Sequence, residues 1–288
     1  MITRILGAAT AALALASAQA QTPITVKVYT SDANSFHVNS TLVFGAKEAL
    51  VIDAGFTRAD ALRIAANVLD SGRELKTILV SQADPDYYFG AETLKQIFPN
   101  ADVVATPAVI EKINAKLVAK VSFWGPKMGL NAPKTPVVPK PLSGTTLSVD
   151  GQTVELRGTT GALAHRPYVW IPSAKTITGT IGVFGSGLHV WTADTQTLAE
   201  RTAWVAALDE MAALNPAMVV PGHMASGNAM DVSAIAHTKQ YLQTFEKNLA
   251  SAKQSADLIE SMKRAYPEAK LAIALDIGAK VNKGEMKW

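Results

Sequence analysis

A short polar segment between an apolar strand and a helix most constrains the fold of this chain. The segment runs from Ser81 to Gly90 and follows the continuous apolar run Thr77–Val80, which is typical of a buried parallel strand. The stretch Ala91–Phe98 then has apolar residues at helical spacing. Open α/β sheets bind ligands at the carboxyl ends of their strands, which is where these polar side chains fall. The sequence therefore predicts an α/β fold with a ligand site in this loop.

The composition favours a single α/β domain and excludes several kinds of site. The chain has 288 residues, no cysteine and a formal net charge of +3. Without cysteine there can be no disulfide, no thiolate metal ligand and no cysteine nucleophile, which suits an oxidising compartment. The small positive charge is spread along the chain, so nothing indicates nucleic-acid binding.

The first twenty residues have the pattern of a secretory signal. Arg4 precedes the apolar run Ile5–Ala16, and Ala18 and Ala20 form a small-x-small cleavage site. The run is too short to span a membrane, and no stop-transfer segment follows it. We expect residues 1–20 to be removed and residues 21–288 to form one domain, periplasmic or secreted, without a membrane anchor.

Apolar periodicity predicts two successive β–α halves. The segment Gly125–Pro141 is rich in proline and glycine without periodicity, so we expect a long loop there. Strands are expected at 24–30, 38–44, 49–52, 77–80, 103–105, 146–149, 153–157, 168–171, 176–178 and 218–220, and helices at 58–71, 91–98, 107–121, 197–214, 232–249 and 255–265.

The loop at Ser81 resembles the signature of the metallo-β-lactamase superfamily, [ST]-H-x-H-x-D-H-x-x-G. The chain has S-Q-A-D-P-D-Y-Y-F-G, so Gln82, Asp84 and Tyr87 stand at the three histidine positions and Asp86 is unchanged. The resemblance covers nearly all of the mature chain. It implies a four-layer αβ/βα sandwich.

Further motifs follow in the order of this family. Asp53-Ala54-Gly55 closes a strand, Thr159 stands where the second-half histidine is expected, and Thr180 stands at the bridging aspartate. A terminal Pro221-Gly222-His223 is retained. The resemblance implies that His223 belongs to the site.

The surviving polar residues leave the metal chemistry open. Asp84, Asp86 and His223 could form a single oxygen-rich site for zinc, iron or manganese. His165 is either a replacement ligand or a histidine of a surface turn. Alternatively no metal binds. Two adjacent carboxylates then repel each other, which raises the pKa of one and suits it to general-base catalysis, or the pair is simply solvated.

Other residues are candidates for substrate contact. The resemblance places His189 at the mouth of the site and implies that Gln82, Tyr87 and Thr180 line it. Trp124 is a candidate lid aromatic in the proline-rich loop, or it packs against that loop.

Two functions are compatible with this pattern. The first is a secreted hydrolase that acts on an ester, lactone or amide of a small molecule through a reduced metal site, with Asp86 and Asp84 as catalytic residues and Asp86 orienting the attacking water. The second is a metal-free, non-catalytic relative that binds a small ligand or a partner in the periplasm.

Overall fold

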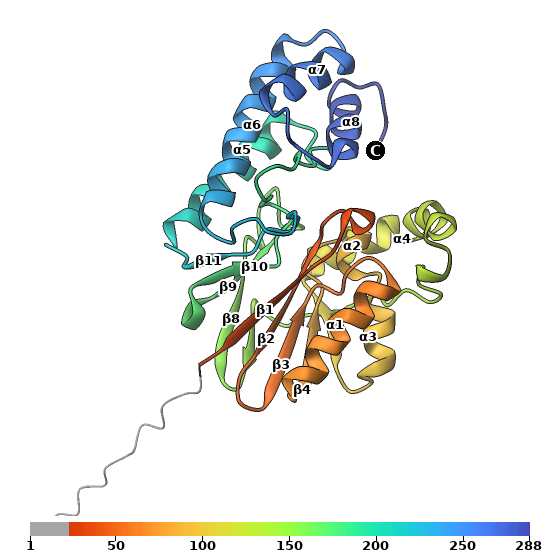
Figure 1. Ribbon diagram of the computed structural model, residues 1–288, viewed down its shortest axis with the longest axis vertical. Helices are drawn as coiled ribbons and strands as arrows, with labels where there is room; N and C mark the ends of the chain where they lie inside the picture. The colour runs from red at the N-terminus through yellow and green to blue at the C-terminus, as the bar shows by residue number, and fades with distance from the viewer. Residues whose placement is uncertain (1–22) are drawn as a thin grey trace, which may run out of the picture.

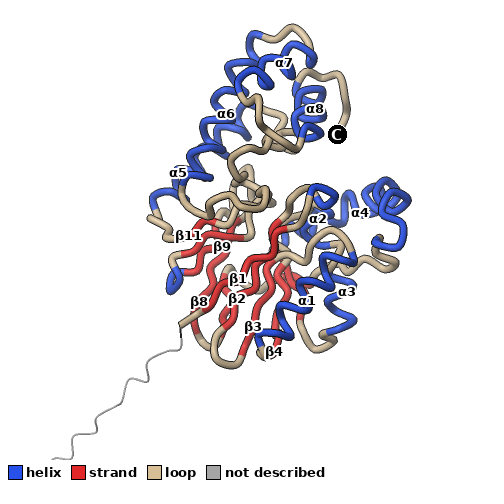
Figure 2. The backbone as a smooth tube through the Cα atoms, viewed as in Figure 1, coloured by secondary structure: helices blue, strands red, loops and turns tan. Residues whose placement is uncertain are grey.

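Two β-sheets pack face to face and carry helices on their outer faces in the computed structural model, which describes residues 23–288 (Figure 1). The predicted signal at residues 1–20 lies outside the described residues. Figure 2 shows the strands in red, with α1 and α3 in blue beside the first sheet and α5 and α6 extending from the end of the second. The predicted αβ/βα sandwich is therefore confirmed.

The first sheet is mixed, with antiparallel pairing between its first three strands and parallel pairing between the others. Its strand order is β1 (Thr25–Thr30), β2 (Asn39–Phe44), β3 (Glu48–Ile52), β4 (Glu74–Leu79), β5 (Asp102–Ala105) and β6 (Lys140–Pro141).

The second sheet is antiparallel except for its last pair, β10 with β11. Its strand order is β11 (Met218–Val219), β10 (Thr176–Thr178), β9 (Tyr168–Ile171), β8 (Gln152–Arg157) and β7 (Thr146–Val149).

Helices pack on the outer side of each sheet. The first sheet is covered by α1 (Arg58–Ser71), α3 (Ala91–Ile97) and α4 (Pro107–Met128). On the second sheet, α5 (Leu198–Ala213) packs beside α6 (Ser233–Ser251), while α7 (Ser255–Ala265) and α8 (Ala272–Asn282) stack beyond α6, away from the strands. The one-turn α2 (Pro85–Tyr88) lies in the polar loop after β4, and short 3-10 turns lie at Ala33–Ser35, Gly129–Asn131 and Pro172–Ala174.

The core between the sheets is aliphatic. Leu50, Ile52 and Leu79 of the first sheet pack against Val169 and Ile171 of the second. Alternate residues of the antiparallel strands point into this layer, while the others meet the helices. Burial of this apolar surface joins the two halves of the chain and brings their strand ends to one edge.

Two predictions from sequence differ from the structure. Helix α4 continues through Gly125 and Pro126 to Met128, so the expected loop is shorter and Trp124 lies on a helix. The helix continues because Trp124 and Met128 pack against the helical core of the first half. Helix α8 was not predicted. It follows Leu271, a residue with φ of 62°, and has no side-chain N-cap.

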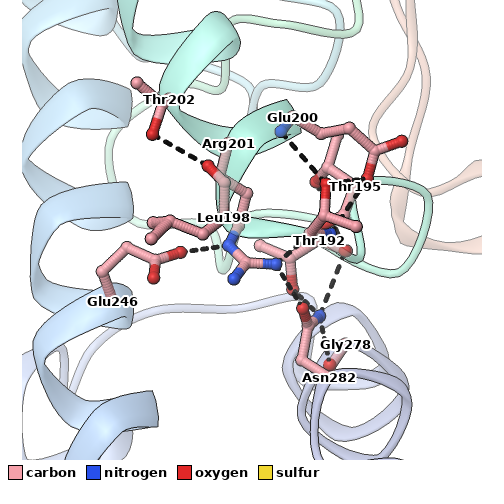
Figure 3. Close-up of polar contacts among 10 residues, drawn as sticks. Thr192, Thr195, Leu198, Glu200, Arg201, Thr202, Glu246, Gly278 and Asn282 are labelled. Carbon is pink, nitrogen blue, oxygen red and sulfur yellow. Dashed lines mark hydrogen bonds and ion pairs between the residues drawn. The ribbon is translucent and has the colours of Figure 1, made fainter. Parts of the chain in front are cut away.

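A buried arginine ties three helices of the second half together (Figure 3). Arg201 on α5 forms an ion pair with Glu246 on α6 and donates to Oδ1 of Asn282 on α8. It also donates to the Thr195 carbonyl oxygen at 2.8 Å. Only 4 % of the Arg201 side chain is exposed, so these partners satisfy a charge removed from water. The network fixes α8, which forms part of the site described below.

Within residues 23–288, no helix combines the length and the apolar character needed to cross a lipid bilayer.

Candidate functional site

The two halves of the chain meet at the polar loop after β4 and at the turn after β11. His223 pairs through its backbone with Val38 and with Phe184. The amide of Asn39 donates to the Gly222 carbonyl oxygen at 2.8 Å. These bonds join the His223 turn to the start of β2 and to the segment around Phe184, at the edge predicted from the strand ends.

Gly222 is required at this turn because its neighbours leave no space for a side chain. A Cβ at this position would lie 2.1 Å from the Thr180 carbonyl oxygen and 2.3 Å from the Tyr87 hydroxyl. The backbone of the turn therefore lies directly against the polar loop, and His223 follows at a fixed place.

Asp86 and His223 face each other at this edge. His223 Nε2 lies 3.6 Å from Asp86 Oδ2, and their side chains are only 7 % and 9 % exposed, respectively. The other ring nitrogen, Nδ1, lies 2.9 Å from the carbonyl oxygen of Phe36. A carbonyl oxygen only accepts, so Nδ1 carries the proton and Nε2 presents a lone pair towards Asp86.

Burial shifts the pKa values of this pair in opposite directions. Burial lowers the pKa of His223 to about 4, despite its bond to Phe36. Burial, together with the nearby carboxylate of Asp84, raises the pKa of Asp86 to about 8. At neutral pH the pair consists of a neutral imidazole and a protonated carboxyl group. The expectation that two adjacent carboxylates would raise the pKa of one agrees with this.

Asp84 forms an ion pair with Lys120 of α4. Burial alone would raise the pKa of Asp84, but the Lys120 ammonium overrides it and holds the pKa below its ordinary value. Lys120 is itself largely buried, with 13 % of its side chain exposed. The Lys120 ammonium contacts Oδ1 of Asp84, so this oxygen is not free to bind a metal ion.

Gln82 and Tyr87 are buried and serve the packing of the loop. Gln82 Nε2 donates to the carbonyl oxygens of Pro167 at 2.8 Å and Gly179 at 3.3 Å. The Tyr87 ring meets the His223 ring edge to face, and its hydroxyl has no hydrogen-bond partner among residues 23–288. Both side chains are neutral and hold the two halves together.

The donor set does not fit the metal site suggested by the resemblance. Members of the family typically bind zinc. No group of three or more histidine, aspartate or glutamate side chains is arranged to hold a metal ion in the described part of the chain. Lys120 neutralises Asp84, so Asp86 and His223 remain as donors. Two donors are fewer than the four protein ligands of a structural zinc site or the three of a catalytic one. The predicted Asp84, Asp86 and His223 site is thus not formed, and His165 does not complete it.

An apolar cleft of about 420 Å³ opens above the Asp86–His223 pair. Phe123 and Trp124 of α4 form one wall, and Trp124 meets the rings of Phe36 and Phe56 edge to face or nearly so. The opposite wall comes from the second half, from residues Phe184, Trp191, Leu271, Ile273, Ile277 and Trp288. Aromatic walls with a few convergent polar groups are typical of sites for small organic molecules.

A second cavity of about 400 Å³ adjoins the cleft and is polar. The two cavities share Asp84, Lys116, Lys120, Ile181 and Trp288 in their walls. Gln82 and His165 also line the polar cavity, and burial lowers the pKa of His165. The site therefore consists of two adjoining cavities, one apolar and one charged.

Three predicted contact residues, Tyr87, His189 and Thr180, line neither cavity. His189 is buried in the helical half, where its Nδ1 lies 3.0 Å from the Tyr241 hydroxyl, and it lines neither cavity. Its neighbours Leu188 and Val190 are core residues, which draws the segment inward. Thr180 is fully buried and accepts a bond from the Gly182 amide at 2.9 Å. It shapes a turn, and the neighbouring Ile181 meets the cavities instead.

Sequence patterns missed the cations of the site. Lys120 and Arg166 lie far from the motif loop in sequence, and no motif marks them. The spacing of Lys112, Lys116 and Lys120 on α4 was a usable signal, because residues four apart share one face of a helix. The C-terminal wall was missed because α8 lacks a start signal.

Asp53 binds the first residue of the polar loop, and its titration should affect the stability of the fold. Its carboxylate accepts bonds from the Ser81 amide at 2.8 Å and the Ser81 hydroxyl at 2.7 Å. Complete burial raises the pKa of Asp53 to about 7, from 3.8. A folded pKa above the unfolded one means that the stabilising contribution is full below about pH 4 and is lost as the pH rises through about 7.

We expect Asp53→Asn to remove this part of the pH dependence, because an amide of the same shape can accept from the Ser81 amide and donate to its hydroxyl. Urea unfolding of both proteins at pH 5 and pH 8 measures it. The variant should gain in free energy of unfolding relative to the wild type on going to pH 8. If the free energies of unfolding of the variant and the wild type differ by the same amount at pH 5 and at pH 8, Asp53 does not titrate in this range.

Comparison with known proteins adds the family. A sequence profile described as the metallo-beta-lactamase superfamily matches residues 33–223. A comparison with curated protein sequences finds no match. Solved structures with a similar fold include a metallo-beta-lactamase family protein from Thermus thermophilus, at 19 % identity and a TM-score of 0.62, which covers 91 % of this chain and 93 % of that one.

Two further structures share the fold at a lower TM-score of 0.54. A metallo-beta-lactamase from Pontibacter korlensis is 19 % identical, over 78 % of this chain and 97 % of that one. The DIM-1 metallo-beta-lactamase exposed to ceftazidime is 18 % identical, over 78 % of this chain and 95 % of that one. Identities this low show the fold alone.

Proposed function

Because the chain belongs to the metallo-beta-lactamase superfamily, whose members are mostly hydrolases, we propose that it hydrolyses an ester, lactone or amide bond in a small, largely apolar molecule. The apolar part of the substrate lies in the cleft between α4 and α8. The reaction uses Asp86 and His223 and needs no metal ion held by the side chains of the site. The substrate-class prediction from sequence is kept, and the predicted metal-dependent mechanism is replaced.

The paired groups supply an acid and a base. Neutral His223 Nε2 takes a proton from water as the water oxygen bonds to the substrate carbonyl carbon. The protonated Asp86 carboxyl donates a hydrogen bond to the substrate carbonyl oxygen while this oxygen gains negative charge. The hydrogen bond is stronger because the Asp86 side chain is largely removed from water. As the bond to the leaving group breaks, the imidazolium returns the proton to the leaving oxygen or nitrogen.

The observation that carries this proposal is the opposed pKa shift of two facing groups at the floor of an apolar cleft. Two neighbouring titratable groups whose environments separate their pKa values are a mark of acid–base sites. Both side chains also lie in the wall of the cleft, where a ligand can meet them.

Chromogenic esters of different chain length test the proposal. We expect hydrolysis of p-nitrophenyl octanoate to exceed that of p-nitrophenyl acetate in kcat/KM, because the longer acyl chain fills the cleft. Rates should be unchanged by a chelator. Dependence on added zinc, iron or manganese would contradict the metal-independent mechanism.

We expect Phe123→Ala to reduce this chain-length preference by about tenfold, through loss of apolar contact with the longer chain. Phe123 is half exposed, at 53 %, so the variant should fold normally. Leu198→Ala, an exposed apolar residue at the start of α5, is the control and should behave as the wild type. Equal kinetics of the two variants would place the substrate outside the cleft.

A metal-free, non-catalytic binding protein is the second candidate function. It is favoured by the Asp84–Lys120 ion pair, which fills part of the motif loop with a fixed structural contact. Binding of the neutral apolar dye Nile red in the cleft, without hydrolysis of any ester, lactone or anilide offered, would support it over the hydrolase.

We further propose that the protein acts in the periplasm or outside the cell after removal of residues 1–20. The charged, apolar and small-residue segments in that order support this. Mass spectrometry of protein from the native host should find a chain that begins at Gln21. A soluble chain that retains Met1 would contradict it.

A further inference from the structure

The polar cavity beside the cleft contains an arginine without a direct ion-pair partner. Among residues 23–288, no carboxylate lies within ion-pair distance of Arg166, although this side chain lines the cavity. The carboxylates of Asp194, Asp84 and Glu200 attract it from farther away and offset part of the effect of burial, which lowers its pKa. Its Nη2 donates weakly to the Ile181 carbonyl oxygen at 3.5 Å, and in the described part of the chain its Nη1 has no hydrogen-bond partner. A guanidinium removed from water in this way favours the arrival of an anion.

The position of the guanidinium is fixed before any ligand arrives. Its central carbon lies 4.1 Å from the centre of the Trp204 ring, and Trp204 is held by a bond from Nε1 to the Gly182 carbonyl oxygen at 2.7 Å. Stacking on an aromatic face leaves the edge of the guanidinium free to bind two oxygens of a planar anion. The arrangement therefore needs little ordering on binding.

The remaining charges of the cavity are mostly compensated. Lys116 pairs with Asp194 at 3.4 Å, and Lys120 pairs with Asp84. The Glu200 carboxylate is occupied by the amide and hydroxyl of Thr197, each at 2.9 Å, as the cap of α5. Lys112, at the rim, has no carboxylate partner in the described chain. Arg166 and Lys112 are thus the cations left for a ligand.

We propose that this cavity binds a carboxylate group of the substrate through Arg166, with Lys112 adding attraction at the rim, so that the substrate is an amphipathic carboxylate whose apolar part occupies the adjoining cleft. This inference rests on the proposed function for the position of the apolar part. The five lining residues that the two cavities share place them side by side, as a molecule with a charged and an apolar end requires.

Matched ligands separate the two parts of the site. The neutral dye Nile red reports the cleft, and octanoate and 1-octanol, which have equal chains, compete for it. We expect octanoate to displace the dye at a concentration at least about tenfold lower than 1-octanol, as a charge-assisted bond to arginine predicts. In Arg166→Gln the advantage of octanoate should disappear, while displacement by 1-octanol stays within about twofold.

Arg264→Gln on the exposed face of α7 is the matched control and should keep the wild-type preference for octanoate. Lys112→Gln should reduce the preference only slightly, because Lys112 is exposed. Equal displacement by the two ligands in the wild type, or equal loss of both in Arg166→Gln, would overturn the carboxylate site. Absence of Nile red binding, or binding unaffected by Phe123→Ala, would instead count against the apolar cleft of the proposed function.

Discussion

Replacement of Arg201 by leucine should lower the free energy of unfolding by about 3 kcal/mol, since removing one partner of a buried ion pair leaves the other groups unsatisfied. Glu246, the Thr195 carbonyl oxygen and Asn282 Oδ1 would all lose their donor. The Glu246 side chain is 30 % exposed and regains some contact with water, which moderates the loss. Urea unfolding monitored by circular dichroism measures it.

Arg264→Leu is the matched control for this prediction. Arg264 forms an ion pair with Glu260 four residues earlier, but its side chain is 66 % exposed. Exposed pairs of this kind contribute about 0.5 kcal/mol or less. Comparable losses in both variants would show that the Arg201 network does not specially stabilise α5, α6 and α8.

The Arg201 network also bears on function, because α8 supplies Ile273 and Ile277 to the wall of the cleft. Arg201→Leu should therefore weaken Nile red binding at a temperature at which the rest of the chain stays folded. Binding equal to that of the wild type under those conditions would mean that α8 keeps its place without Arg201.

Much of the fold was predictable because each strand of the core has a regular apolar pattern and a clear end. The run before Ser81 and the turn after Val220 identify two strand ends, and the order of motifs identifies the sandwich. Helix α8 was missed, because a strained start at Leu271 replaces the usual capping residue. Its burial depends on tertiary contacts that no local pattern encodes.

The site was predictable in position and less so in chemistry. The facing of Asp86 and His223 follows from the strand ends, and the fold places both in the cleft as the motif order indicates. The ion pair of Asp84 was not predicted, because its partner, Lys120, lies on a helix 36 residues away. The lysine spacing indicates a basic helix face, but a single sequence does not show which carboxylate that face meets.

His223 and Asp86 carry the prediction with the largest effect. We expect His223→Ala to reduce kcat/KM for p-nitrophenyl octanoate by about 10²- to 10⁴-fold, the range for loss of a general base. Asp86→Ala should cause a similar loss. Both variants should still bind Nile red, because the aromatic walls of the cleft are unchanged. Loss of dye binding would point to a collapsed site and not to lost chemistry.

The pH profile of the wild type separates this mechanism from a metal-dependent one. The reaction needs neutral His223 and protonated Asp86, so kcat/KM should be highest between about pH 4 and about pH 8. It should fall at lower pH as His223 gains a proton and at higher pH as Asp86 loses one. Because the two side chains face each other, the two pKa values that limit the profile describe the pair and not each residue separately.

Asp86→Asn tests the acid by itself, because an asparagine amide still donates a hydrogen bond but cannot ionise. This variant should keep most of the neutral-pH activity and lose the fall above about pH 8, whereas Asp86→Ala should lose activity at every pH.

Plasma mass spectrometry after incubation with zinc, iron and manganese completes the test. Stoichiometric metal in the wild type that disappears in Asp86→Asn, together with an unchanged alkaline limb, would refute the acid–base pair and restore a metal to the site. The buried, facing side chains of Asp86 and His223 predict that the protein is free of metal and that kcat/KM of Asp86→Asn no longer falls at alkaline pH.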